Sequence, residues 1–144
     1  MKLILVILFF LITSRIFAPA DNTVIIPVPE EINRWLDLWR ATCIIESENN
    51  PLMINVREGA YGIVQIRQCK LDDFNKATSG NYVLSAVVNE AVSREIFLHH
   101  CCSCKSNEEA ARTWNGGPRG MEKPQTKIYW DKVRMVLERS KSQI

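Results

Sequence analysis

A carboxylate stands at the end of an apolar run in the stretch CIIESENNP, residues 43–51. Apolar residues precede it at the spacing of one helix face: Ile32, Trp35, Leu36, Trp39 and Cys43. The next position on that face is Glu46. The pattern predicts a helix that begins after Pro29 and carries Glu46 on its buried face, close to its C-terminal end.

A glutamate in this position has a defined acid–base chemistry. Burial disfavours the charged carboxylate and raises its pKa, and the partial negative charge at a helix C-terminus acts in the same direction. A glutamic acid that stays protonated near neutral pH can donate a proton to the oxygen of a glycosidic bond. The alternative is a structural role, in which a buried Glu46 is held by an arginine or lysine.

Most glycosidases use two carboxyl groups, so a second acid is of interest. Four residues are candidates: Glu48, Glu58, Asp72 and Asp73. None of them has a helical spacing that fixes its position relative to Glu46. The residues alone therefore do not establish a mechanism with two acids.

The chain has five cysteines: Cys43, Cys69, Cys101, Cys102 and Cys104. In an exported protein the first expectation is disulfides, with at least one thiol left over because five is odd. His99 and His100 precede the cysteine cluster and would share helix faces with Cys102 and Cys104, which is a possible metal-ligand pattern. It matches no standard zinc spacing, so we expect no metal and no cofactor.

The N-terminus has the features of an export signal. Lys2 is followed by the apolar core LILVILFFLI, and small residues at Ala18 and Ala20 resemble a cleavage site. Ten helical residues rise only about 15 Å, half of the roughly 30 Å hydrocarbon core. We therefore expect a cleaved signal over residues 1–20 and a protein in the periplasm, cell envelope or medium. An uncleaved segment that holds the protein on the membrane is the alternative.

The charge of the chain argues against nucleic acid as a partner. The formal net charge is +2, and residues 1–20 contribute Lys2, Arg15 and no acidic residue. Without residues 1–20 the chain has 16 of the 18 basic residues and 16 acidic residues. No basic excess is left to neutralise phosphates.

The rest of the sequence predicts one mainly α domain over residues 30–144, after an extended, proline-rich linker at 21–29. Further helices are expected at 71–80, 83–100, 107–116 and 126–141, with a small irregular or β-like piece at 52–66. Asn107 is the expected N-cap of its helix. The last helix should bury the apolar residues Ile128, Val133, Val136 and Leu137.

Four blocks of the sequence are similar to the motifs of lytic transglycosylases of the soluble lytic (SLT) type. IIESENNP resembles the E-S-x-x-N-P motif, YGIVQI resembles G-L-M-Q-I, and ARTWNGGPRG resembles A-Y-N-A-G-P. The block KIYWDKV resembles the terminal Y-V-x-x-V helix. The blocks follow the family's order and cover most of the chain beyond the signal.

This resemblance implies a lysozyme-like α domain, α+β with minimal β, that cleaves the β-1,4 bond between N-acetylmuramic acid and N-acetylglucosamine in peptidoglycan. Family members use a single catalytic glutamate, which here is Glu46. It acts first as an acid on the leaving oxygen and then as a base on the C6 hydroxyl of the muramic sugar. The product is a 1,6-anhydro sugar, so no second carboxylate is needed.

The resemblance also implies roles for other residues. Tyr129 would hydrogen-bond the catalytic carboxyl. Ser47, Gln65, Trp114 and Asn115 would form the substrate-binding cleft, with Ser47 orienting the glutamate or capping the helix, and Trp114 and Asn115 contacting sugar. Each has a structural alternative: a helix end for Ser47, backbone hydrogen bonds for Gln65, and the hydrophobic core for Trp114.

The sequence departs from the family at several positions, including Trp114 for tyrosine, Gly116 for alanine and Ile63-Val64 for Leu-Met. These changes bear on glycan preference more than on the reaction. Three other functions stay open: a muramidase that uses water on the same fold, a non-catalytic glycan-binding protein, and a metal-binding protein built on His99, His100 and the cysteines. A remodelling enzyme, a helper of a secretion apparatus and a phage protein are equally compatible with the sequence.

Overall fold

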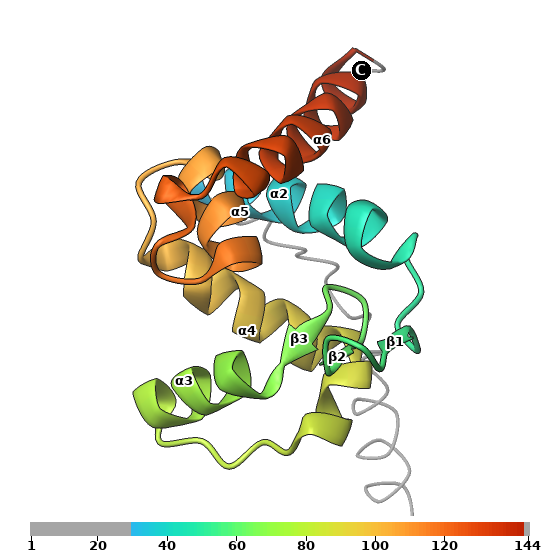
Figure 1. Cartoon of the computed structure of the whole chain (residues 1–144), viewed down its shortest axis with the longest axis vertical. Helices are drawn as coiled ribbons and strands as arrows, with labels where there is room; N and C mark the ends of the chain where they lie inside the picture. Colours follow the sequence, from blue (N-terminus) through green and yellow to red (C-terminus); the bar gives the residue numbers. More distant parts are fainter. Residues whose placement is uncertain (1–29, 143–144) are drawn as a thin grey trace, which may run out of the picture.

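The computed structural model describes residues 30–142 (Figure 1), so the predicted signal and linker lie outside the described part. That part is mainly helical, with one small sheet. Its long helices are α2 (Glu30–Ser47), α3 (Gln68–Thr78), α4 (Glu90–Cys102), α5 (Asn107–Gly116) and α6 (Pro124–Lys141). Two short 3-10 helices, η1 (Leu84–Val88) and η2 (Gly120–Glu122), connect them. Among these residues no helix is both long enough and apolar enough to cross a membrane.

The sheet occupies the region where the sequence predicts a small β-like piece. It has three antiparallel strands of two residues in the order β1 (Ile54–Asn55), β2 (Ala60–Tyr61) and β3 (Ile66–Arg67). Tyr61 pairs with Ile54 on one side and with Ile66 on the other. The sheet lies between α2 and α3 in the chain, so it directly follows the helix that carries Glu46.

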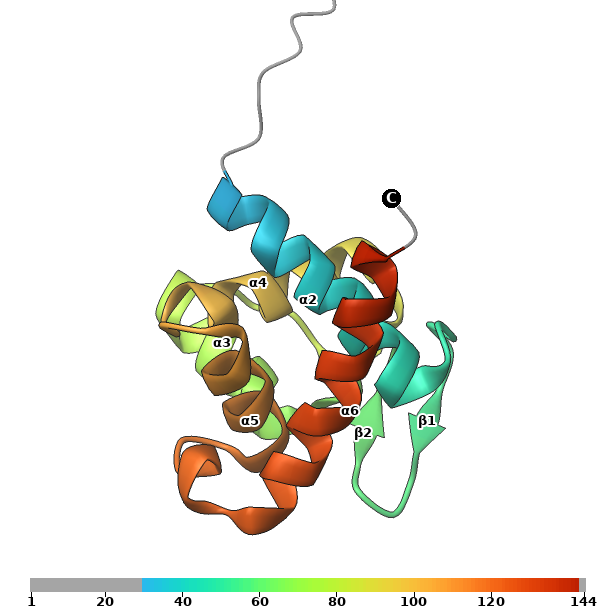
Figure 2. The same cartoon turned by 90° about the horizontal axis from the view of Figure 1, so that it is seen from above.

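The helices form two groups. In Figure 1 α4 runs through the middle, with α2, α5 and α6 on one side and α3 and the sheet on the other. Helix α6 packs against both α2 and α5, next to α2 in Figure 2, and its last turns project beyond the rest of the fold in Figure 1. The first and the last described helices are therefore neighbours in space.

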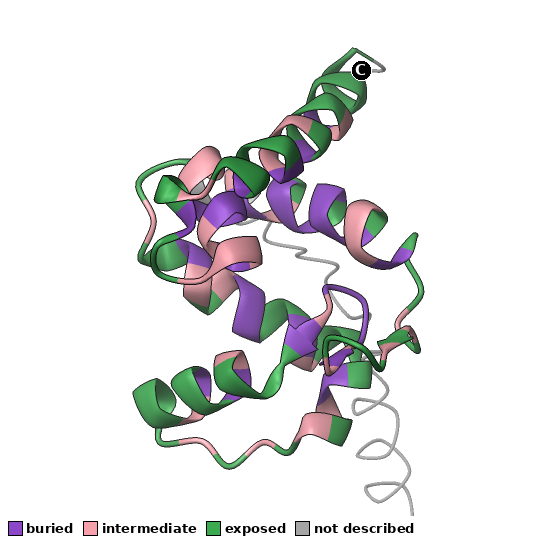
Figure 3. Ribbon diagram, viewed as in Figure 1, coloured by how far each residue is buried: buried purple, intermediate pink, exposed green. Residues whose placement is uncertain are grey.

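Aromatic contacts in the core join α4 to α2 and α5. The ring of Phe97 on α4 lies 5.5 Å from the ring of Trp39 on α2 and 4.9 Å from the ring of Trp114 on α5, both edge to face. Such pairs add about 0.5–1.5 kcal/mol to the free energy of burial. Buried side chains line the inner faces of the helices, while the last turns of α6 are largely exposed (Figure 3).

Several predicted element boundaries were wrong for local reasons. The helix predicted at 83–100 is two elements, because the Asn89 side chain accepts a hydrogen bond from the Ala91 amide at 2.9 Å and caps a new helix there. The α5 N-cap is Ser106 and not Asn107; its hydroxyl accepts from the Glu109 amide at 3.1 Å.

The buried face of α6 also differs from the prediction. Ile128 is 62% exposed, and the residues that face the core are Thr126, Tyr129, Val133 and Leu137. These four follow a spacing of three and four, which is the period of one helix face. Ile128 is one position outside that face. The helix begins at Pro124, two residues before the predicted start, and proline suits this first position.

Candidate functional site

Glu46 and Tyr129 meet in space although 83 residues separate them in the chain. The Tyr129 hydroxyl donates a hydrogen bond of 2.8 Å to Glu46 Oε1. Glu46 comes from the last turn of α2 and Tyr129 from the first half of α6, so the packing of these two helices creates the contact. Tyr129 is 9% exposed, which places the hydrogen bond at the inner end of the site.

The end of α2 is fixed by its own backbone. The Glu48 amide donates to the Ile44 carbonyl at 3.1 Å and the Asn49 amide to the Cys43 carbonyl at 3.2 Å. Glu48 and Asn49 both have positive φ angles, 54° and 64°, so two successive left-handed residues end the helix. This stop places Glu46 one position from the helix end, where the sequence predicted it.

Glu46 opens into a cavity of about 390 Å³. Its walls come from the end of α2, the sheet, the start of α3, the end of α5 and the first half of α6. The polar or charged residues among them are Glu46, Asn55, Glu58, Gln65, Arg67, Cys69, Lys70, Asn115, Lys123, Tyr129 and Lys132. This volume is within the range of small-molecule sites, about 300–1,000 Å³.

The local environment sets the protonation of Glu46. Burial raises the pKa of Glu46 from 4.5 to about 7, and the nearby Glu58 carboxylate adds to the rise. The hydrogen bond from Tyr129 and the positive charge of Arg67 oppose it, but burial is the larger effect. At neutral pH the carboxyl is therefore poised between its acid and base forms.

Tyr129 stays protonated in the same conditions. Burial, with the neighbouring Glu46 carboxylate, raises the pKa of the Tyr129 phenol well above its usual value of 10. The phenol therefore remains a hydrogen-bond donor to Glu46 whichever form the carboxyl takes.

Three consecutive residues of the β2–β3 loop, Ile63, Val64 and Gln65, connect parts of the site that are far apart in the sequence. The Ile63 carbonyl accepts from the Ser47 hydroxyl at 2.7 Å, and the Val64 carbonyl accepts from Trp114 Nε1 at 3.1 Å. Gln65 then adopts a φ of 54° and turns its side chain toward the cavity. The loop thus connects α2, α5 and the cavity wall.

Gly62 makes this loop possible. Its φ is 77°, and a Cβ at this position would lie 2.4 Å from the Val87 carbonyl oxygen. Any side chain would force the loop away from η1.

Ser47 has a positioning role and not the substrate-binding role that the resemblance implied. It is 3% exposed and does not line the cavity. Its hydroxyl donates to the Ile63 carbonyl and accepts from the Asn50 amide at 3.1 Å, so both of its functions are used inside the protein.

Gln65, Trp114 and Asn115 all reach the cavity, but in different ways. The Gln65 amide nitrogen is held by the carbonyls of Gly62 at 2.9 Å and Met53 at 3.2 Å. This leaves the amide oxygen as the group that can face a ligand. Asn115 is half-buried at the wall and free to use both of its amide atoms.

Trp114 belongs mainly to the core. It is 7% exposed, its ring packs edge to face on Phe97 and on His100, and its indole nitrogen is bound to Val64. Only part of the ring contributes to the cavity wall. We therefore assign it packing at the base of the cavity and not an open stacking surface for a sugar.

The cysteines and histidines do not form the sites considered for them. All five cysteines are free thiols, so the expected disulfides are not formed. Within residues 30–142 no group of three or more histidine, cysteine or acidic side chains is arranged to hold a metal ion. His100 contacts the Thr113 hydroxyl at 3.1 Å and Lys70 Nζ at 3.3 Å, and burial lowers the pKa of this imidazole to about 4.

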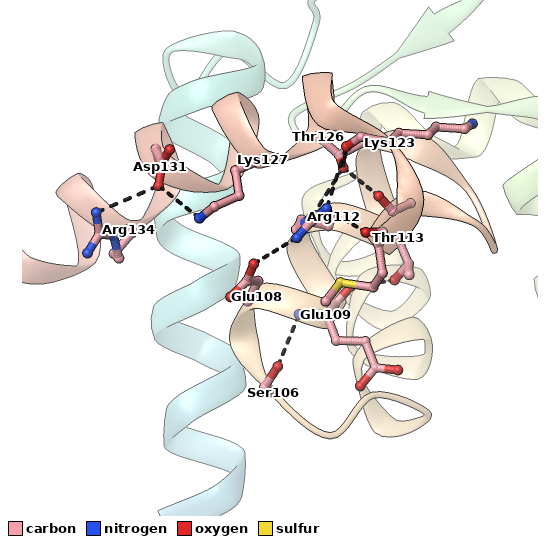
Figure 4. A network of polar contacts seen from close by, with 12 residues as sticks. Ser106, Glu108, Glu109, Arg112, Thr113, Lys123, Thr126, Lys127, Asp131 and Arg134 are labelled. Carbon is pink, nitrogen blue, oxygen red and sulfur yellow. Dashed lines mark hydrogen bonds and ion pairs between the residues drawn. The ribbon is translucent and has the colours of Figure 1, made fainter.

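A buried arginine fixes the start of α6 relative to α5 (Figure 4). Arg112 Nη1 pairs with Glu108 at 2.9 Å, while its Nη2 donates to the Met121 carbonyl at 2.7 Å and its Nε to the Thr126 hydroxyl at 3.2 Å. Tyr129 is one turn beyond Thr126. The position of Tyr129 beside Glu46 therefore depends on this network.

Sequence reasoning missed the basic residues of the cavity: Arg67, Lys70, Lys123 and Lys132. Lys132 follows Tyr129 by three residues on α6, and this spacing was a usable signal. Glu58 was one of four candidate acids, and the structure selects it, because Glu58 lines the cavity and pairs with Arg67 at 2.7 Å. No protein-family model matches the chain, and a search of curated proteins finds no relative.

Proposed function

We propose that this chain is a lysozyme-like lytic transglycosylase, exported to the cell envelope, that cleaves the β-1,4 bond between N-acetylmuramic acid and N-acetylglucosamine in peptidoglycan. The observation that carries the proposal is the hydrogen bond of 2.8 Å between Tyr129 and Glu46 in a cavity that raises the pKa of Glu46 to about 7. The resemblance of four sequence blocks to SLT-type enzymes supports the same reaction.

In the first step Glu46 acts as the acid. Its proton passes to the glycosidic oxygen, the bond from C1 of the muramic sugar to that oxygen breaks, and N-acetylglucosamine leaves with a free C4 hydroxyl. The carboxylate that remains accepts the Tyr129 hydrogen bond, which stabilises its charge. The sugar's own N-acetyl oxygen stabilises the positive charge at C1.

In the second step the same carboxylate acts as the base. It takes the proton of the C6 hydroxyl of the muramic sugar, and the C6 oxygen attacks C1 to close the 1,6-anhydro ring. Glu46 is then protonated again, and no water is consumed. A pKa near 7 suits both halves of this cycle, because neither the acid nor the base form is strongly disfavoured at neutral pH.

The remaining residues of the site have supporting roles. The Gln65 amide oxygen and the Asn115 amide can hydrogen-bond the sugar and its N-acetyl group. Ser47 fixes the end of α2 to the β2–β3 loop and so holds Glu46 in place.

A second candidate function is hydrolysis by a muramidase on the same fold. The observation that favours it is Glu58, a second carboxylate on the wall of the same cavity. Glu58 is held at the wall by its ion pair of 2.7 Å with Arg67, and a second carboxyl group is what a hydrolytic mechanism with water requires. A glycan-binding protein without activity is the third possibility.

Product analysis separates the three. Purified peptidoglycan is digested with the wild type and with Glu46→Gln, and the soluble fragments are weighed by mass spectrometry. Anhydro-muropeptides that the wild type releases and Glu46→Gln does not would support the transglycosylase. Reducing-end products that disappear in Glu58→Gln would support hydrolysis. Glycan binding without any soluble product from the wild type would contradict both enzymatic functions.

A further inference from the structure

The cavity around Glu46 is lined by basic side chains although the chain beyond residue 20 has equal numbers of basic and acidic residues. Arg67 and Lys70 lie at the start of α3, and Lys123 and Lys132 lie on or next to the first half of α6. The acids on the wall are Glu46 and Glu58. Positive charge is therefore concentrated at the cavity, although basic and acidic residues are balanced over the chain beyond residue 20.

Three of these cations already have partners inside the protein. Arg67 is neutralised by Glu58 at 2.7 Å. Lys70 Nζ contacts the His100 ring at 3.3 Å and the Thr113 carbonyl at 3.4 Å, and burial lowers the pKa of this ammonium group. Lys123 Nζ donates to the Gly116 carbonyl at 2.5 Å.

Lys132 differs from the other three. It is exposed, and it makes no ion pair with any side chain in residues 34–142, whereas its neighbours on α6 do: Lys127 and Arg134 both pair with Asp131. Lys132 follows Tyr129 by three residues, so the two side chains are neighbours on one face of the helix. Because Tyr129 reaches Glu46, Lys132 lies one helical turn further along the wall from the reacting bond.

An uncompensated ammonium group beside a partly enclosed cavity attracts anions, because the low-dielectric walls focus its field. Glu46 is half neutral near pH 7 and Glu58 is paired, so the field at the mouth is positive. In the proposed substrate the glycan chain itself is uncharged. Its anionic groups are the carboxylates of the peptides attached to muramic acid.

We infer that Lys132 forms a subsite for a carboxylate of the peptide stem, so that this cleft cleaves glycan with peptides in preference to glycan without them. The inference rests on the proposed function for its substrate. Lysine suits this task, since its ammonium is a flexible point charge that can follow a mobile peptide. Lys123, whose ammonium group binds a neutral backbone carbonyl, adds positive charge to the same cavity wall.

The test compares intact peptidoglycan with the same material after an amidase has removed the peptides and the muramic acid carboxyls exposed in this way have been capped as methylamides, so that the bare glycan carries no carboxylate. Both are first stripped of phosphodiester-linked polymers, so that a phosphate ligand cannot produce the difference. Lys132→Gln should lower the initial rate on the peptide-bearing material about threefold, the size expected of an exposed charge pair, and leave the rate on the bare glycan unchanged. The wild-type preference should shrink at high salt.

The matched control is Lys127→Gln, which removes a lysine from the same helix outside the cavity. It should change neither rate. An equal loss on both materials for Lys132→Gln, or no loss on either, would overturn the subsite.

A binding measurement separates this inference from the proposed function. Glu46→Gln and the double variant Glu46→Gln/Lys132→Gln are sedimented with each material, and the bound fraction is measured. Tighter binding of the single variant to the peptide-bearing glycan, lost in the double variant, supports the subsite even where the wild type shows no cleavage. Cleavage by the wild type with equal binding and equal rates on both materials would support the enzyme and reject the subsite.

Discussion

The Ser47 hydroxyl donates a hydrogen bond of 2.7 Å to the carbonyl oxygen of Ile63, and so joins the residue after Glu46 to the loop that carries Gln65. Both partners are buried, Ser47 at 3% and Ile63 at 5% exposure. One short contact therefore links the proposed acid to the opposite wall of the cavity.

Ser47→Ala should lower both stability and activity. The Ile63 carbonyl would lose its partner in a buried place, which costs about 1–3 kcal/mol in the free energy of unfolding. Urea denaturation measures this loss. Ser140→Ala is the control, since the exposed Ser140 hydroxyl donates to the Val136 carbonyl at 3.0 Å, and its loss should change stability by no more than about 0.5 kcal/mol. Equal effects of the two variants would contradict the role of the Ser47 contact.

Glu46→Gln should abolish cleavage while the fold is kept. Glutamine has the same shape and can still accept the Tyr129 hydrogen bond, but it has no proton to transfer at neutral pH. The rate of release of soluble fragments from peptidoglycan should fall at least about a thousandfold, since the same group serves as acid and base. Glu48→Gln, at an exposed residue outside the cavity, should retain full activity. Appreciable cleavage by Glu46→Gln would remove Glu46 from the mechanism.

Tyr129→Phe should shift the pH profile as well as the rate. The Tyr129 hydrogen bond stabilises the charged form of Glu46 and lowers its pKa, so its removal raises that pKa above about 7. The alkaline limb of kcat should then move to higher pH, and the maximal rate should fall about 10- to 100-fold because the carboxylate loses its donor. Tyr82→Phe is a matched control, because Tyr82 makes an exposed bond to Glu95 at 3.3 Å. An unchanged alkaline limb in Tyr129→Phe would disprove the coupling.

The raised pKa of Glu46 also predicts a cost in stability. Between pH 4.5 and about 7 the folded chain binds the Glu46 proton more tightly than the unfolded chain does. The unfolding free energy therefore falls as pH rises through this window, by about 3 kcal/mol in total. Glu46→Gln removes this cost, so its stability relative to the wild type should increase over the window and stay constant above it. Parallel stability curves for the two proteins would show that the carboxyl is not perturbed.

Arg112→Met should damage the site from a distance. The variant leaves the Met121 carbonyl and the Thr126 hydroxyl without their charged donor, and the free energy of unfolding should fall by about 3 kcal/mol. Since these contacts fix the start of α6, the rate should fall together with the stability. Arg134→Met, which breaks only exposed pairs, should change neither by much. A full rate in a destabilised Arg112→Met would show that α6 holds Tyr129 in place without this network.

The helical content and the place of Glu46 were predictable, because the apolar stripe from Trp35 to Cys43 has a clear period and continues to Glu46. The small sheet was predictable only as a region, since strands of two residues have no alternating pattern to detect. The break at Asn89 was missed because the apolar spacing continues across it, while a single side-chain cap decides the boundary. A single capping residue is a weaker signal in the sequence than apolar periodicity, so a helix boundary that depends on a cap is easily missed.

The site was predictable in part for a similar reason. The approach of Tyr129 to Glu46 was expected only from the resemblance to SLT-type enzymes, because no local pattern links residues so far apart. The burial of Trp114 and the internal bonds of Ser47 depend on three-dimensional packing, which residue types alone do not determine. The basic wall of the cavity combines Arg67 and Lys70, around the start of α3, with Lys123 and Lys132, around the first half of α6, and these segments line one cavity only in the folded chain.

The contact between Glu46 and Tyr129 joins the first described helix to the last across 83 residues. While the chain is being synthesised or translocated, α2 emerges before α6. At that stage Glu46 lacks both the Tyr129 hydroxyl and the wall of the cavity that α6 provides. The proposed catalytic centre is therefore complete only when the last helix has docked. If the chain cleaves peptidoglycan as proposed, this order confines its activity to the finished fold and withholds it during synthesis.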